Sequence, residues 1–246
     1  MNDKNIERNR YNESAKNALK NNDFFSVNNL TLPLKTPYAF FQSVIFEYAD
    51  RDSLILEFGA GMGENTEYLL ATGARVCATD ISEDSLSVLS KRFDTDKLTT
   101  EVADMENLPF EDRTFDIVAS AGSLSYGDNN AVLNEIYRVL KHNGAFIAID
   151  SLNNNPIYRL NRYIHYLKGD CSLSVIRRMP DLKLLQKYEK KFGKIEAYFF
   201  GSISYLVPML NKLIGEVRTK KISDSIDKMV DVKYSAYKFV LIAEKK

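Results

Sequence analysis

Residues 54–66 read LILEFGAGMGENT, an apolar run followed by three closely spaced glycines and a polar stretch. The run from Leu54 to Phe58 has the length of a buried strand. Glycines adopt backbone angles that other residues resist, and they let a ligand lie against the main chain. The free amide groups at the start of a following helix would face that ligand. The stretch therefore predicts a strand, a tight turn and a helix around a ligand site.

The chain on both sides of this turn alternates between short apolar runs and helical patterns. Apolar runs recur at residues 75–79, 98–102, 115–120 and 144–150, and helical patterns separate them at 65–71, 82–93 and 129–141. The connection between Val102 and Phe115 is irregular instead. Strands that alternate with helices indicate a parallel, doubly wound α/β sheet. Two further strands are expected at residues 195–200 and 237–243.

The segments outside this core are expected to cover it. The first 30 residues are polar and rich in asparagine, which favours short helices and loops lying across the domain. Apolar residues at spacings of three and four predict a helix over residues 36–48. We predict a single domain with an N-terminal helical lid region (1–50), a cofactor-binding core (51–150), helical substrate-cap insertions (151–194 and 201–233) and closing strands (195–200 and 234–246).

Composition narrows the class of protein. The 246 residues are 45% hydrophobic and 27% charged, as in a globular protein with a sizeable core. The first ten residues hold no apolar run that would make a secretory signal, and polar residues interrupt the apolar stretch 199–214. Two cysteines provide neither a disulfide framework nor a metal-binding spacing. We therefore expect a cytoplasmic protein with no membrane span and no metal site.

The charges are balanced overall but not along the chain. Residues 1–150 carry 14 basic and 24 acidic side chains, whereas residues 151–246 carry 19 basic and 9 acidic ones. The overall balance predicts no nucleic-acid partner. If the basic second half builds the substrate pocket, it favours an anionic substrate. The alternative is that these lysines coat solvated helices.

The glycine turn differs from a dinucleotide fingerprint, because Glu64 occupies the place of the last glycine in G-x-G-x-x-G. The pattern is instead E-x-G-x-G-x-G. This pattern makes residues 54–150 resemble the class I S-adenosylmethionine-dependent methyltransferases. The resemblance extends to Asp80, which ends the second strand 17 residues after Gly63, and to Asp104 after the third. Residues 108–118 and 133–144 also match the family's approaches to its fourth and fifth strands.

The resemblance implies a Rossmann-like, mostly parallel seven-stranded sheet with an antiparallel last strand. It also implies S-adenosyl-L-methionine as the cofactor. Asp80 would accept hydrogen bonds from the ribose hydroxyls, and Ile81 would cover one face of the adenine. Asp104 and the Met105 amide would meet the ring edge. The remaining implied contacts are the turn Gly59, Ala60, Gly61 and Gly63, the ammonium partners Glu57 and Ser120, and a lid tyrosine, Tyr11.

The acceptor is expected beside residues 156–167, which form a two-faced helix. Ile157, Leu160, Ile164 and Leu167 share one face, and the other face carries Tyr158, Arg159, Arg162, His165 and Tyr166. Arginine forks suit phosphate or carboxylate groups. We predict that the polar face binds substrate, and that His165 (as a base) and Tyr126 (in the loop after the fourth strand) are catalytic. The alternatives are a solvated helix and a tyrosine that only packs its loop.

These features predict methyl transfer from S-adenosylmethionine to an oxygen or nitrogen of a small anionic acceptor, such as a nucleotide-linked sugar. Two alternatives stay open. One is a methyltransferase for an apolar quinone-like or lipid-like precursor, with residues 199–215 lining its pocket. The other is a non-catalytic module that binds S-adenosylmethionine and regulates a partner. No oligomeric state is indicated.

Overall fold

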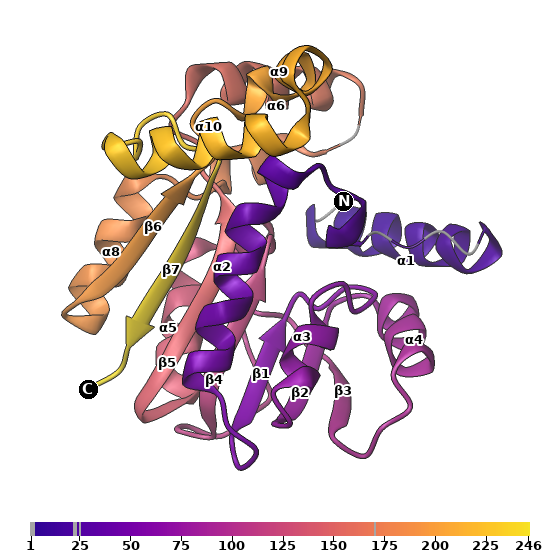
Figure 1. The fold of residues 1–246 in the computed structure, drawn as a ribbon. Coiled ribbons are helices and arrows are strands. Elements are labelled where there is room, and N and C mark those ends of the chain that lie inside the picture. Colours follow the sequence, from indigo (N-terminus) through magenta and orange to yellow (C-terminus); the bar gives the residue numbers. More distant parts are fainter. Residues whose placement is uncertain (1–2, 22–23, 25, 170) are drawn as a thin grey trace.

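The structure, a computed structural model, describes residues 3–21, 24, 26–169 and 171–246. Seven strands form one sheet in the order β3-β2-β1-β4-β5-β7-β6 (Figure 1). Their bounds are β1 Leu54–Phe58, β2 Arg75–Asp80, β3 Leu98–Val102, β4 Phe115–Ala121, β5 Leu140–Ser151, β6 Ile195–Phe200 and β7 Lys238–Glu244. Strand β7 runs antiparallel to both of its neighbours, and the pairings among β1 to β5 are parallel. The predicted α/β sheet with an antiparallel last strand is confirmed.

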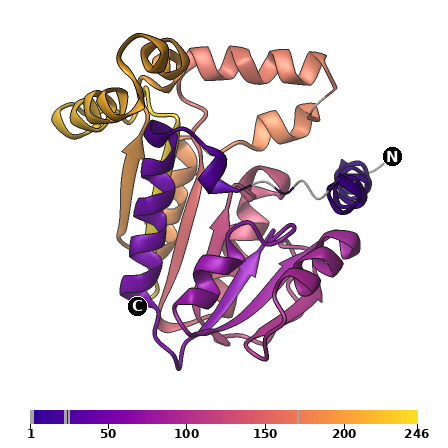
Figure 2. The same ribbon diagram turned by 45° about the vertical axis from the view of Figure 1, so that its right-hand side comes forward.

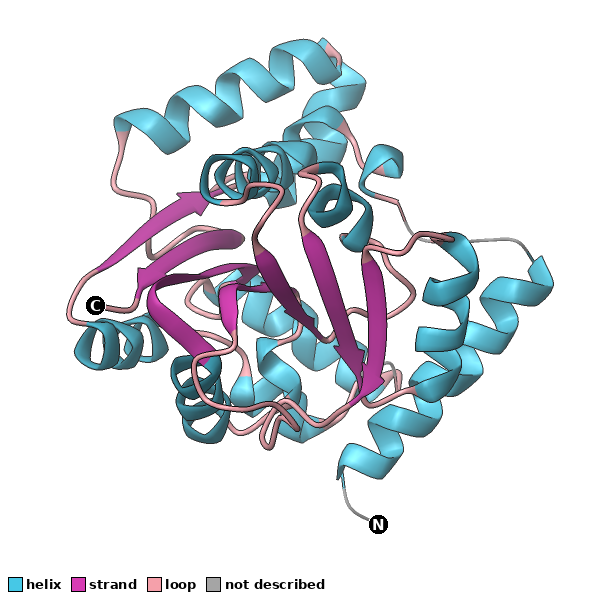
Figure 3. Ribbon diagram, turned by 90° about the horizontal axis from the view of Figure 1, so that it is seen from below, coloured by secondary structure: helices cyan, strands magenta, loops and turns pink. Residues whose placement is uncertain are grey.

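Helices cover both faces of this sheet (Figure 3). Helices α2 (Leu32–Tyr48), α3 (Thr66–Ala71) and α4 (Glu83–Arg92) lie on one face, where α2 buries Phe41, Val44 and Ile45 against the strands. Helices α5 (Asn129–Val139) and α8 (Leu182–Phe192) lie on the other face. The connection from β3 to β4 holds turns and an isolated bridge between Asp104 and Asn107, in agreement with its irregular sequence.

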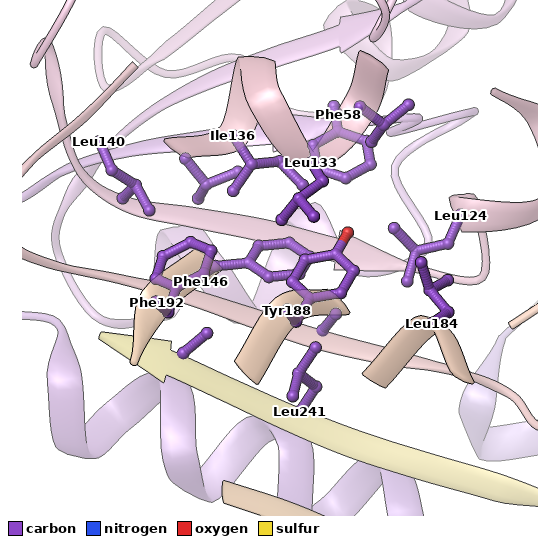
Figure 4. Close-up of a cluster of buried hydrophobic side chains, with 14 of the residues drawn as sticks. Phe58, Leu124, Leu133, Ile136, Leu140, Phe146, Leu184, Tyr188, Phe192 and Leu241 are labelled. Carbon is purple, nitrogen blue, oxygen red and sulfur yellow. The ribbon is translucent and has the colours of Figure 1, made fainter. Parts of the chain in front are cut away.

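The core under α5 and α8 is built around stacked aromatic rings (Figure 4). Phe146 of β5 lies between Phe58 and Tyr188, with ring centroids 6.1 and 5.4 Å away and nearly parallel planes. Each such pair contributes about 0.5–1.5 kcal/mol beyond the burial of its area. Phe58 is the last residue of β1, so this packing fixes the strand end from which the glycine turn starts.

The N-terminal segment is one continuous helix, α1 (Asp3–Asn21), where the sequence predicted short helices and loops. Tertiary contacts explain the difference, because the segment packs along α4. Ala15 and Ala18 are buried, and the hydroxyl of Ser82 donates to the side-chain oxygen of Asn12 at 2.6 Å. Asparagine lowers local helix propensity, and packing overrides it here. Residues 1, 2, 22, 23 and 25 of the same prediction lie outside the described residues.

Apart from α8, β6 and β7, the elements after β5 gather beyond the carboxyl ends of the parallel strands (Figures 1 and 2). They are α6 (Pro156–Leu167), α7 (Leu173–Arg178), the short 3-10 helix η3 (Ser204–Leu206), α9 (Val207–Ile214) and α10 (Glu216–Met229). Within the described residues, none of the helices combines the length and apolar character that crossing a membrane requires. This end of the sheet is where ligands of open α/β folds bind.

Candidate active site

A cavity of about 350 Å³ lies at the carboxyl ends of β1, β2 and β4. Eight of the residues predicted to contact the cofactor or acceptor line it: Tyr11, Gly59, Ala60, Gly61, Asp80, Ile81, Met105 and Tyr126. The lining also includes residues that the sequence analysis did not select, among them Ser14, Glu64, Asn65, Ser85, Gly122 and Ser123. Glu64 and Asn65 directly follow the quoted glycines, which is the signal that points to them.

Position 59 requires glycine because the turn after β1 and the loop after β4 approach each other closely there. Gly59 has φ +63°, and a Cβ atom added to it would lie 2.4 Å from the Cβ of Ser123 in the loop after β4. No real side chain fits at that distance. The Ser123 hydroxyl donates to the carbonyl of Phe58 at 3.2 Å and is 2.7 Å from the Ser120 hydroxyl. The two loops therefore hold each other as adjoining walls of the cavity.

Asp80 lies at the tip of β2 with its carboxylate held by the backbone. Its Oδ2 accepts from the Gly61 amide at 3.0 Å, and its Oδ1 accepts from the Ser82 amide at 2.9 Å. Burial raises the pKa of this carboxyl, and the backbone hydrogen bonds act in the opposite direction. A carboxylate that is fixed in this way presents its remaining lone pairs to the cavity without further ordering.

Four of the predicted cofactor residues lie outside the cavity lining: Glu57, Gly63, Asp104 and Ser120. Glu57 is buried behind the glycine turn, where it accepts a hydrogen bond from the Thr66 hydroxyl at 2.6 Å. Asp104 forms an ion pair with Lys4 of α1 at 2.5 Å. Glu57 and Ser120 thus brace the walls, and Asp104 ties α1 to the loop after β3. Their predicted contacts with the cofactor stay predictions.

Replacing Glu57 with glutamine should flatten the pH dependence of stability. Burial raises the pKa of Glu57 from 4.5 to about 8. Between these values the folded state keeps a proton that the unfolded state loses, so rising pH destabilises the wild type. The amide of the variant never ionises, and its oxygen can still accept from Thr66. Denaturant unfolding over a pH series should give a wild-type free energy of unfolding that falls by a few kcal/mol more than that of Glu57→Gln. Parallel curves would contradict the assignment.

Helix α1 contributes a tyrosine and an arginine to the open side of the cavity. The ring of Tyr11 meets the ring of Tyr126 edge to face, with centroids 5.6 Å apart. Arg10 lies over the Tyr11 ring at 5.2 Å, pairs with Glu7 at 2.6 Å and donates to the Tyr126 hydroxyl at 3.4 Å. Tyr11, Arg10 and Tyr126 therefore form one cluster, which joins α1 to the loop after β4.

A second cavity of about 340 Å³ adjoins the first, and the two share Gly122 and Tyr126. Its polar lining comes from distant parts of the chain: Arg10, Asp150, Ser151, Arg162, His165 and Lys238. Arg162 donates to the Ser151 hydroxyl at 3.3 Å, and the Lys238 ammonium is 3.5 Å from the same oxygen. Three cationic side chains thus converge on a space beside the first cavity.

Lys238 is the most deeply buried of these cations, with 6% of its surface exposed. Burial by itself would lower the pKa of Lys238, but Tyr38, Tyr237 and Asp150 together raise it above its usual value. Burial raises the pKa of Asp150, against the effect of Lys238. The Asp150 carboxyl accepts from the amides of Leu124 and Ser151. Lys238 therefore carries a positive charge at the inner end of this cavity.

The five side chains of the predicted polar face of α6 lie in four different environments. Arg162 and His165 line the second cavity, whereas Arg159 lines a separate depression with Arg177. Tyr158 contacts the Ser204 hydroxyl and packs beside the ring of Tyr237, 5.1 Å between centroids. Tyr166 is 38% exposed and belongs to neither lining. The structure thus brings two of the five side chains to the second cavity.

Three charged residues of the second cavity, Lys238, Asp150 and Arg10, were not predicted from the sequence. Lys238 opens strand β7, whose next five residues are apolar, and pairs in register with Ser151 of β5. A lysine at the start of a buried strand was the available signal. Arg10 carried no such signal, because its position depends on where α1 lies.

Comparison with known proteins agrees with this architecture. Residues 56–148 match a family model described as a methyltransferase domain. The chain is 28% identical over 137 residues to the sterol 4-C-methyltransferase of Caenorhabditis elegans, a match that covers 52% of this chain and 41% of the relative. It is 38% identical over 122 residues to the demethylmenaquinone methyltransferase of Clavibacter sepedonicus, a match that covers 47% and 48%. The matched segment therefore spans less than half of either curated relative.

A solved structure matches over most of the chain. The geranyl diphosphate C-methyltransferase from Streptomyces coelicolor A3(2), in complex with Mg²⁺, geranyl diphosphate and S-adenosyl-L-homocysteine, superposes with a TM-score of 0.59. The match is 16% identical and covers 86% of this chain and 80% of that one. At this identity the likeness establishes the shared fold.

Proposed function

We propose that the chain is a class I S-adenosylmethionine-dependent methyltransferase that methylates an oxygen or nitrogen of a small anionic acceptor. The cofactor occupies the cavity at the glycine turn. Asp80 accepts from the ribose hydroxyls, Ile81 covers the adenine, and the turn from Gly59 to Gly61 lies along the amino-acid part. Tyr11 covers the opening from α1. The lining of this cavity supports each of these placements.

One observation carries the choice of acceptor: Arg10, Arg162 and Lys238 converge in the cavity that shares Gly122 and Tyr126 with the cofactor site. Glu7 pairs with Arg10, and Asp150 lies near both Lys238 and Arg162. Arg162 donates its hydrogen bond to the uncharged hydroxyl of Ser151. An anionic group would therefore receive charge-assisted hydrogen bonds from Arg162, each contributing about 1.5–3 kcal/mol. A phosphate-bearing sugar has this chemistry.

The rate of methyl transfer depends above all on aligning the acceptor atom with the methyl carbon and the sulfur. The acceptor atom attacks the methyl carbon, the carbon–sulfur bond breaks, and the sulfonium becomes the neutral thioether of S-adenosylhomocysteine. Holding the three atoms in line contributes up to about 7–11 kcal/mol. We assign the orientation of the acceptor to Tyr126, which lines both cavities, and the removal of a proton from a hydroxyl acceptor to His165.

The alternative of an apolar acceptor has less support. It would place the acceptor among the apolar residues of 199–215, yet Met209 is 53% exposed and Leu213 is 71% exposed. The described lining of the second cavity includes no residue of that segment. A regulatory module without catalysis would bind S-adenosylhomocysteine but transfer no methyl group to any member of an acceptor library.

Replacing Arg162 with glutamine should raise KM for the acceptor about tenfold, because one charge-assisted hydrogen bond to the anion is lost. Cofactor affinity should not change. An acceptor-library screen with methyl-labelled cofactor identifies the acceptor, and steady-state kinetics then give KM. Arg177→Gln, on the exposed part of α7, is the matched control and should keep the wild-type KM. A best acceptor without an anionic group, or an unchanged KM for Arg162→Gln, would refute the proposal.

A further inference from the structure

Helix α6 is amphipathic in the reverse sense of a usual surface helix. Its polar residues Arg162 and His165 face the second cavity. Its apolar residues face outward, with exposed fractions of 47% at Ile157, 64% at Leu160, 43% at Ile164 and 81% at Leu167. Surface helices normally bury the apolar stripe and expose the polar one. An outward apolar stripe of this length indicates a contact with something outside the chain.

A second outward apolar stripe runs from η3 along α9 to the start of α10. Tyr205 of η3, Met209 and Leu213 of α9, and Val217 of α10 are 44%, 53%, 71% and 60% exposed. Met209 and Leu213 share one face of α9, and Gly215 separates α9 from α10. The two stripes lie at the same end of the molecule (Figures 1 and 2). They are joined where Tyr158 of α6 contacts Ser204 and packs near the ring of Tyr205. We call these two stripes together the outer cap surface.

The charges around this surface determine which occupant fits. Residues 151–170 contain Arg159, Arg162 and Lys168 against one acidic residue, Asp170. Residues 204–218 contain Lys212 and Arg218 against one acidic residue, Glu216, whose carboxylate accepts from the Leu32 amide. Arg159, Lys168 and Lys212 are exposed. Two copies of the chain meeting through this surface would bring like charges together. An anionic bilayer instead accepts the apolar side chains among its acyl chains while the basic groups reach the lipid phosphates.

We propose that the outer cap surface docks on anionic lipid bilayers, with α6 and α9 lying in the interface. The inner face of α6 lines the second cavity, so docking would bring that cavity close to the bilayer surface. An anionic acceptor held at the lipid headgroups would then have a short path to the site. The docking itself does not depend on the acceptor proposal, and it is tested without cofactor or acceptor.

The test is co-sedimentation with vesicles of phosphatidylcholine alone or mixed with phosphatidylglycerol. The wild type should sediment with the mixed vesicles, bind neutral ones more weakly, and dissociate at about 1 M salt, where charges are screened within about 3 Å. The double variant Leu167→Glu/Leu213→Glu should bind the mixed vesicles at least about tenfold more weakly, because acidic groups replace two inserting side chains. Lys212→Ala should weaken binding about fivefold.

The matched control is Phe46→Glu, which places the same charge at a half-exposed apolar residue of α2. It should bind vesicles like the wild type. Binding of S-adenosylhomocysteine by every variant verifies that the protein is folded. The proposal is overturned if the wild type ignores anionic vesicles or if the double variant binds them as well as the wild type. It is equally overturned if the double variant abolishes a concentration-dependent dimer instead, which would assign the surface to a second copy.

Discussion

Gly59→Ala should weaken the binding of S-adenosylhomocysteine by about 100-fold or more. The added methyl group would lie 2.4 Å from the Ser123 Cβ, so one of the two loops must move. Overpacking of this kind costs about 1–3 kcal/mol. The positive φ of Gly59 adds roughly 1–2 kcal/mol for an alanine. Isothermal titration calorimetry of the wild type and the variant measures the loss directly.

A second glycine, Gly193, serves as a control that separates the steric clash at Gly59 from the strain of its positive φ. Gly193 also has a positive φ, +89°, but an added Cβ would meet nothing within 4 Å, and the residue ends α8 away from the site. Gly193→Ala should therefore lose stability by roughly 1–2 kcal/mol and keep its affinity for S-adenosylhomocysteine. Equal affinity losses in the two variants would show that the close approach of the loops at Gly59 is not what shapes the site.

Asp80→Ala should lower the affinity for S-adenosylhomocysteine about 100-fold. The proposed pair of hydrogen bonds from the ribose hydroxyls to a charged acceptor contributes about 1.5–3 kcal/mol for each bond. The substitution also releases the Gly61 amide, which Asp80 holds at 3.0 Å, so the turn loses its bracing. Asp80→Asn tests the charge alone and should retain part of the affinity, because its side-chain oxygen can still accept.

The control for Asp80 is another carboxylate on the same side of the fold. Asp84 of α4 pairs with Lys16 of α1 at 3.2 Å, and both side chains are well exposed. Exposed pairs contribute little, so Asp84→Ala should bind S-adenosylhomocysteine like the wild type. An unchanged affinity in Asp80→Ala would refute the ribose assignment, whereas a loss in both variants would point to displacement of α1.

Local sequence patterns predicted most strand positions because short runs rich in β-branched, aromatic and other apolar residues alternate with helical segments. The bounds of β1, β3 and β6 agree with the prediction at both ends. Strand β5 was expected from residue 144 and begins at Leu140, directly after α5 ends at Val139. Leu140 pairs with Phe115 across a register shift in β4, so tertiary pairing extends the strand into residues that read as helix.

The residues of the site likewise fall into those that local sequence predicted and those that it did not. The glycine turn and Asp80 were predictable because a strand end, a turn and a helix start lie within a few residues of each other. The second cavity was predicted only through Tyr126 and, on α6, Arg162 and His165. Its remaining charges, Arg10, Asp150 and Lys238, come from three distant elements, and no periodicity within one segment reports such a convergence.

The sequence by itself determined the sheet, the cofactor turn and the two faces of α6, because each follows from hydrogen-bonding geometry and spacing within a short segment. Only the tertiary structure decided which way α6 faces. A helical pattern separates polar from apolar side chains but does not say which side meets the protein. Here the polar side meets the second cavity and the apolar side meets the surroundings, since the position of α6 beyond β5 brings Arg162 to Ser151.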